Sequence, residues 1–305
     1  MSRFAIICVA MSLAVGTLAS AQDMPTDYQD VLTSLGKKGD YKANVLKVNI
    51  PRNDLHVTVA NVKTPTPFGF GGWVAMTKAT DGMDVMMGDL VLTQDEVNPV
   101  MSALLDNGLE VTALHDHFFW EDPRVYYMHV HGHGKPAELA RELKPALDLI
   151  GKRSGAATTP PPSASAPPPA TLDTAKIAQI VGPPGEQTGE VYKITVGRDD
   201  LKLTEMGAPI TTRMGLNTWA AFVGTNEKAA VAGDVAMLAS EVTPVLKALR
   251  SNGLNIVAIH HHMTETRPTV FFLHYWGTGP VENLATGFKA ALAELGKSNG
   301  SASRE

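Results

Sequence analysis

The chain repeats itself over most of its length, and this repeat constrains its fold more than any other feature. Residues 88–134 align with residues 233–279 without a gap, and about 19 of 47 aligned positions are identical. Upstream the match continues with a shift of one residue, pairing Arg52 with Arg198, Asp54 with Asp200, Leu55 with Leu201 and Trp73 with Trp219. A repeating unit of domain size excludes a short-period solenoid. The sequence therefore predicts two copies of one domain.

A segment rich in proline, alanine, serine and threonine separates the two copies. It runs from Arg153 to Leu172, shows no apolar periodicity, and is typical of an extended linker. We predict a first domain at residues 27–152, a second at 173–297, and a disordered tail at 298–305. The 305 residues of the chain suffice for two domains of ordinary size.

Apolar spacing predicts the elements of each copy. In the first copy, strands are expected at residues 45–50, 55–59, 73–77, 84–92, 109–117 and 124–131. Helical spacing follows at residues 96–105, where Asn107-Gly108 gives a stop signal, and again at residues 139–150. We therefore predict an α+β fold of two homologous domains related by a pseudo-twofold. Each is an antiparallel sheet with two helices on one face, in a split β-α-β-like arrangement.

The N-terminal residues have the pattern of an export signal. Arg3 supplies a positive charge, residues 4–18 are mostly apolar, and Ala19-Ser20-Ala21 is typical of a signal-peptidase site. We predict a signal peptide at residues 1–21 and a periplasmic or secreted mature protein. The alternative is an uncleaved anchor; after cleavage no stable membrane insertion is expected.

Composition narrows the chemistry of any site. Cys8 is the only cysteine, and it lies inside the predicted signal peptide, so the mature chain should hold metal through nitrogen and oxygen alone. The net charge is −5, and the chain has no long basic run. These features give no support to nucleic-acid binding.

Histidines gather at equivalent places in the two copies. A His-x-His pair is followed by a further histidine, as His115, His117 and His129 in one copy and as His260, His262 and His274 in the other. Alternate residues of a strand share a face. A tight hairpin centred near Pro123 would set His117 opposite His129 and His115 opposite His131. Trp276 takes the place of His131 in the second copy.

Imidazole is the commonest protein ligand for metals, so this pattern favours a divalent ion. Zinc is the first choice, and copper is the second. The predicted ligands are His115, His117, His129, His131, His260, His262 and His274. Metal-free acid–base or hydrogen-bonding roles remain an alternative, as does the absence of any shared site. His133, His261 and the isolated His56 are expected to lie outside the site.

Two glutamates are candidate catalytic bases. Glu96 with Thr93 reads as a helix capping box, which is a structural role. The position equivalent to Thr93 is Leu238, whose side chain cannot cap, so we expect the capping explanation to fail for Glu241. Asp89 and Asp234 follow a glycine in both copies and are expected either to make buried hydrogen bonds or to support the metal ligands.

No established catalytic signature is present, but one family resemblance is. The run Gly-Asp…Glu-Val-x-Pro-Val…Asn-Gly-Leu…His-x-His…His…Gly-x-Gly resembles the LppY/LpqO family of exported bacterial proteins, a domain of unknown function. Residues 233–279 carry the closest match. The resemblance implies export and duplication, and it implies no reaction. Lipid anchoring does not carry over, because the chain has no lipobox.

The leading hypothesis is an exported His-rich metal-binding protein whose two domains each present a histidine hairpin. If it is an enzyme, metal-assisted hydrolysis in the cell envelope is the expected class. The alternative is a metal-free module that binds a small-molecule or cell-envelope ligand in a cleft between the two domains.

Overall fold

The computed structural model describes residues 22–152 and 172–297. The predicted signal peptide, the predicted tail and all but the last residue of the predicted linker lie outside the described residues. Within the described ranges, no helix combines the length and the apolar character needed to cross a membrane.

The first unit contains three α-helices and nine strands. Its helices are α1 (Thr26–Leu35), α2 (Gln94–Asp106) and α3 (Pro136–Leu147), with a short 3-10 turn, η1 (Thr66–Phe68). Its strands are β1 (Gly39–Lys42), β2 (Val45–Pro51), β3 (Val57–Val59), β4 (Val62–Thr64), β5 (Gly71–Lys78), β6 (Asp84–Thr93), β7 (Glu110–His115), β8 (Glu121–Asp122) and β9 (Val125–Gly134). Six of the strands form one antiparallel sheet in the order β1-β2-β5-β6-β9-β7. The expected strand at residues 55–59 instead forms β3, which joins β4 and β8 in a separate small sheet.

The second unit repeats this plan. Its helices are α4 (Thr174–Val181), α5 (Ala239–Ser251) and α6 (Val281–Leu292), with a matching turn, η2 (Thr212–Met214). Its strands are β10 (Glu186–Thr188), β11 (Val191–Gly197), β12 (Leu203–Glu205), β13 (Ala208–Ile210), β14 (Asn217–Gly224), β15 (Ala229–Leu238), β16 (Asn255–His260) and β17 (Val270–Gly279). The main sheet has the equivalent order β10-β11-β14-β15-β17-β16.

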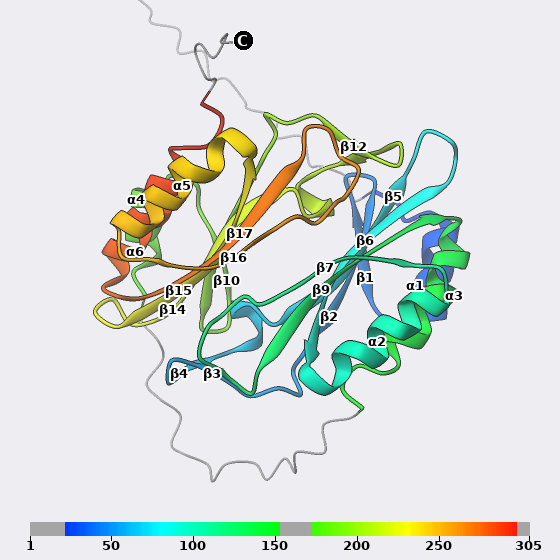
Figure 1. The fold of residues 1–305 in the computed structure, drawn as a ribbon, viewed down its shortest axis with the longest axis horizontal. Coiled ribbons are helices and arrows are strands. Elements are labelled where there is room, and N and C mark those ends of the chain that lie inside the picture. The colour runs from blue at the N-terminus through cyan, green and yellow to red at the C-terminus, as the bar shows by residue number, and fades with distance from the viewer. Residues whose placement is uncertain (1–21, 153–171, 298–305) are drawn as a thin grey trace, which may run out of the picture.

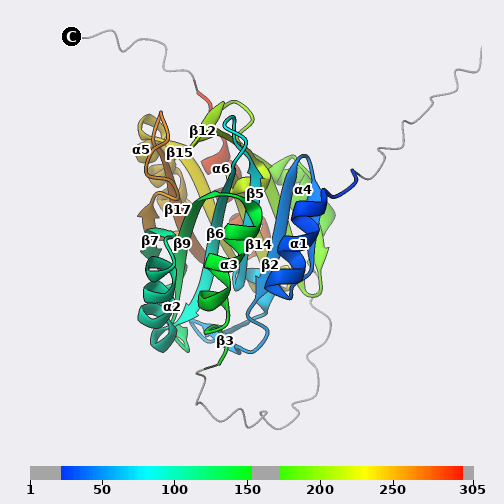
Figure 2. The ribbon, with the colours of Figure 1, turned by 90° about the vertical axis from the view of Figure 1, so that its right-hand side faces the viewer.

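The two sheets face each other, and the helices cover their outer faces (Figures 1 and 2). Leu90, Val100 and Leu143 belong to the apolar core between the first sheet and its helices, and the second unit has an equivalent core. Two further apolar clusters contain residues of both units. One joins Phe118 to Trp276, and the other joins Met87 to Phe272. The architecture is therefore four layers, helix–sheet–sheet–helix, and apolar clusters hold the two sheets together.

The predicted duplicated α+β fold is confirmed, but each unit has one more helix than predicted. Helix α1 buries Tyr28, Val31 and Leu35, which repeat at helical spacing. Helix α4 is capped by Asp173, whose side chain accepts a hydrogen bond from the Lys176 backbone N–H. Both signals are readable in the sequence, but both helices are short and lie next to a predicted signal peptide or linker.

Trp276, which aligns with His131 of the first repeat, packs in the interface between the two sheets. It is 2% exposed, and its ring meets Phe68 edge-on at 5.9 Å and Phe118 at 5.7 Å between centroids. We expect Trp276→Phe to lower the free energy of unfolding by on the order of 1–3 kcal/mol, because it leaves unfilled volume between the sheets. Chemical denaturation measures this. Trp120→Phe is the matched control, because Trp120 is 61% exposed; an equal effect of the two changes would contradict the packing described.

Candidate metal centre

The predicted histidine hairpin forms in a different register from the one expected. β7 pairs with β9 so that His115 lies opposite Tyr127, and Ala113 lies opposite His129. The chain leaves β7 after His115, so His117 lies in the connecting segment. The expected pairings of His117 with His129 and of His115 with His131 are therefore wrong. The displacement is an even number of residues, so His115 and His129 still lie on the same face of the sheet.

The second unit shows the same displacement. Ala258 lies opposite His274, and His260 lies opposite Phe272. Both hairpins carry a bulge before the histidines, between Val111 and Ala113 in one unit and between Ile256 and Ala258 in the other. The connecting segments are long and irregular, and the first contributes β8 to a different sheet. Connections of this kind do not fix register as a tight turn does.

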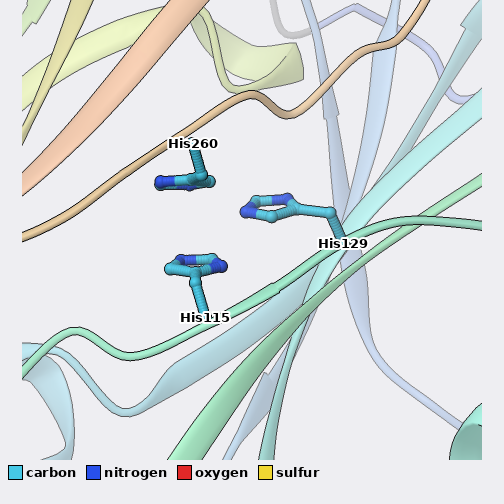
Figure 3. A group of neighbouring side chains, drawn as sticks. All are labelled: His115, His129 and His260. Atoms are coloured by element: carbon cyan, nitrogen blue, oxygen red, sulfur yellow. The ribbon is translucent and has the colours of Figure 1, made fainter.

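The histidines of the two units meet each other across the interface between the sheets. The His115 and His260 rings stack with their centroids 3.7 Å apart. The His129 ring points toward this pair from the side (Figure 3), at 5.1 Å from His115 and 5.4 Å from His260. The centre of the cluster is therefore built by both repeats.

Two further pairs flank this centre, and each also joins one unit to the other. The His117 and His274 centroids are 3.6 Å apart, and the His129 and His262 centroids are 3.9 Å apart. Exchanging the two repeats converts one pair into the other. The six imidazoles thus follow the pseudo-twofold of the duplication.

Two groups of three histidines have ligand nitrogens that all lie within 4.8 Å of one another, close enough to hold a metal ion after small side-chain movements. One group is His115, His129 and His260, and the other is His115, His117 and His274. His115 belongs to both. Each group takes residues from both units, whereas we expected each hairpin to bind on its own.

Many of the ring nitrogens have no hydrogen-bond partner although they are buried. In the cluster these are Nδ1 of His115, both ring nitrogens of His117, Nε2 of His129, both of His260 and Nδ1 of His262. A buried polar atom without a partner costs about 1–3 kcal/mol. An ion at the centre would satisfy several of these atoms at once, so the donor set fits a metal.

Burial keeps these imidazoles neutral, which is the form that binds metal. It lowers the pKa of His260 to about 3, with a further contribution from His261. The pKa values of His117 and His274 lie well below the ordinary value for the same reason, reinforced by the neighbouring histidines.

Backbone carbonyls orient two of the rings. The Nδ1 atom of His274 lies 3.3 Å from the Gly233 carbonyl oxygen, and His129 has the equivalent contact with Gly88. This leaves Nε2 of each ring facing the cluster, as is usual for histidine ligands. A Cβ atom added at position 233 would overlap the Trp219 carbonyl oxygen, so only glycine fits there. This explains why a glycine precedes the aspartate in both copies.

The remaining histidines lie outside both three-histidine groups. His131 is buried, and its Nδ1 lies 3.9 Å from a Glu205 carboxylate oxygen; it belongs to neither three-histidine group. Burial lowers its pKa to about 4. His133 contacts Asp81 at 3.0 Å on the surface, and His56 is exposed. His261 is half-buried and is also outside both groups.

The candidate bases Glu96 and Glu241 are engaged elsewhere. Glu96 is 1% exposed and receives Arg52 Nη1 at 2.6 Å, the Thr93 N–H at 2.8 Å and the Gly151 N–H at 2.6 Å. Arg52 also binds Asp54 through two hydrogen bonds of 2.9 and 2.8 Å. We call this set the arginine clamp. Neither glutamate belongs to a three-histidine group or lines the cavity described below.

The second unit has the same clamp. Glu241 receives Arg198 Nη1 at 2.8 Å, the Leu238 N–H at 2.7 Å and the Gly296 N–H at 2.7 Å. The expectation that capping fails at Leu238 is therefore wrong. The glutamate half of a capping box needs only the backbone N–H of the cap residue, which every residue except proline supplies.

A row of side chains leads across each sheet to the histidines. In the first sheet Asn49 pairs with Trp73, Trp73 with Asp89, and Asp89 with His129. In the second sheet the equivalent row consists of Thr195, Trp219, Asp234 and His274. Apart from His129, both rows line a cavity of roughly 600 Å³ between the sheets, and His117 and His262 also line it.

Two lysines in this cavity were missed by sequence reasoning. Lys47 and Lys193 precede Asn49 and Thr195 by two residues, on the same face of their strands, and both line the cavity. The alignment of the repeats pairs them, so the signal was present. A lysine on a strand is ordinarily read as a solvated residue.

Comparisons with known proteins agree with the duplication. A family model described as a domain of unknown function (DUF1259) matches residues 29–149 and again residues 175–294. No curated protein matches the chain. Among solved structures, the chain is similar to PduB, a trimeric bacterial microcompartment shell protein, with 12% identity over 84% of this chain and 91% of that chain. The TM-score of 0.20 is too low to support an argument.

The two matched segments together cover more than half of the chain and coincide with the two units of the fold. The resemblance to LppY/LpqO stays a prediction, since the matching model carries only the description above. The chain belongs to the DUF1259 family and contains two copies of its domain.

Proposed function

We propose that this protein binds a divalent metal ion in a centre formed by both of its repeats. The observation that carries the proposal is the convergence of six imidazoles, four buried and two half-buried, whose nitrogens largely lack hydrogen-bond partners. A purely imidazole donor set suits zinc, and copper(II) is the alternative. The export signal predicted from the sequence supports a periplasmic or secreted location.

A hydrolytic role is the reaction class that such a centre would serve. Three imidazoles around zinc leave a position for water, whose pKa the ion lowers to about 7. Glu96 and Glu241 are poor candidates for the base because the arginine clamp occupies them. Asp234 lies closer to the site, with Oδ2 3.9 Å from Nε2 of His262. Burial raises the pKa of Asp89 to about 8 and that of Asp234 well above its usual range.

The alternative is a metal-free module that binds a ligand between the repeats. The cavity of roughly 600 Å³ favours it, because both units line that cavity. The two functions differ in what happens when zinc is supplied to the purified protein.

We expect the protein to retain one zinc ion per chain. Both three-histidine groups need His115, so they cannot be filled together unless that ring bridges two ions. Mass spectrometry under non-denaturing conditions gives the stoichiometry directly. Two ions per chain would contradict a single centre and would require His115 to bridge them or a second set of ligands. No retained ion, with zinc and copper both supplied, would leave the metal-free module as the better function.

A further inference from the structure

Three lysines line the cavity above the histidines, and two of them, Lys47 and Lys193, occupy equivalent positions in the two repeats. Lys47 Nζ lies 4.6 Å from the centre of the Trp73 ring, and Lys193 Nζ lies 3.8 Å from that of Trp219. An ammonium over an aromatic face is stabilised by the ring without using its N–H groups. These groups therefore remain free to donate to a ligand.

Among the described residues, neither Lys47 nor Lys193 forms an ion pair within 4.0 Å or donates a side-chain hydrogen bond. Arg213, which also lines the cavity, is already paired with Asp40 at 2.6 Å. The carboxyl groups of Asp89 and Asp234 line the same cavity, but neither lies within 4.0 Å of the Lys47 or Lys193 ammonium nitrogen.

Burial and the charge of Lys47 together lower the pKa of Lys193 to about 8. Lys47 has a pKa of about 8 as well, lowered by burial and by Arg213. Both groups are still mostly protonated at pH 7. Two half-buried cations that line one space form an electrostatic site for an anion.

We propose that the cavity binds a small ligand through an oxyanion, a carboxylate or a phosphate group, held between Lys47 and Lys193. His117, His262 and His274 line the same cavity, so the ligand can reach the ion that the histidines hold. An oxyanion bound in this way would be the ligand of the proposed metal centre, and to that extent the inference rests on the proposed function. A bound dication would add to the positive charge of the cavity.

Isothermal titration calorimetry of the full chain with inorganic phosphate, and separately with acetate, tests this proposal. The tighter of the two probes identifies the oxyanion. We expect the double variant Lys47→Met, Lys193→Met to weaken binding at least about tenfold, since charge-assisted hydrogen bonds to both lysines are lost. Lys47→Arg, Lys193→Arg keeps both charges and should retain most of the affinity. Lys37→Met, an exposed lysine outside the cavity, should change nothing.

Zinc content, measured on the same samples, separates this inference from the metal centre. Loading with zinc should tighten binding of the probe, and the methionine variant should keep its zinc. If neither probe binds at millimolar concentration, or if both bind the methionine variant as well as the wild type, the inference is overturned and the metal centre stands. Lysine-dependent binding by a protein that never takes up zinc would overturn the metal centre and keep the anion site.

Discussion

Replacing His115 with alanine is expected to abolish zinc binding, with a loss in affinity of more than about 100-fold. His115 is the one residue common to both three-histidine groups, so no complete group survives its removal. Loss of a direct ligand should exceed the roughly 10–100-fold that is typical of an outer contact. Competition with a chromogenic chelator at fixed pH measures the affinity, because protons compete with metal for imidazole.

Single changes elsewhere in the cluster should have smaller effects. His117→Ala removes one group and leaves the other, and His129→Ala does the reverse. The double variant His117→Ala, His129→Ala should therefore resemble His115→Ala. His133→Ala is the control, because that side chain contacts only Asp81 on the surface. If His115→Ala bound zinc as tightly as the control variant, the shared centre would be disproved.

Replacing Arg52 with methionine is expected to lower the free energy of unfolding by about 3–5 kcal/mol. Arg52 is 2% exposed, and it joins Asp54, Glu96 and the Val91 carbonyl oxygen. Without the guanidinium, the buried Glu96 carboxylate keeps only the backbone N–H groups of Thr93 and Gly151. Such a group is destabilising because burial opposes its charge.

Denaturation in urea, followed by fluorescence and by circular dichroism, gives this free energy. Arg198→Met should cost a similar amount, since the second clamp has the same bonds. Arg141→Met is the matched control, because that side chain is 74% exposed. Zinc should be excluded by a chelator, so that binding does not add to the measured stability. A loss below about 1 kcal/mol would mean that the clamp contributes little.

Most helices and strands of each unit could be predicted because apolar spacing along the chain is a local signal. The helices at 94–106 and 136–147 and the strands at 71–78 and 84–93 lie close to the predicted ranges. The shared face of His115 and His129 was also predicted, and it holds because the observed register differs from the expected one by an even number of residues.

What the sequence could not predict is where the two copies meet. Nothing in one hairpin indicates that His115 stacks on His260 rather than on a ring of its own unit. That contact depends on the packing of one sheet against the other, which is set by apolar residues spread over the whole chain, such as Phe118 and Trp276. The role of Lys47 was hidden for the same reason, because its surroundings come from both sheets.

Histidines of one repeat pair with histidines of the other, and this affects how the sequences of the two repeats can diverge. A single copy of the domain could build the same six-imidazole centre only as a two-fold dimer, in which every position occurs identically on both sides. Fusion of two copies in one chain removes that requirement. Positions 131 and 276 are equivalent, yet one is a histidine beside Glu205 and the other a tryptophan packed between the sheets. The covalent duplication thus lets a symmetric centre stand within asymmetric surroundings.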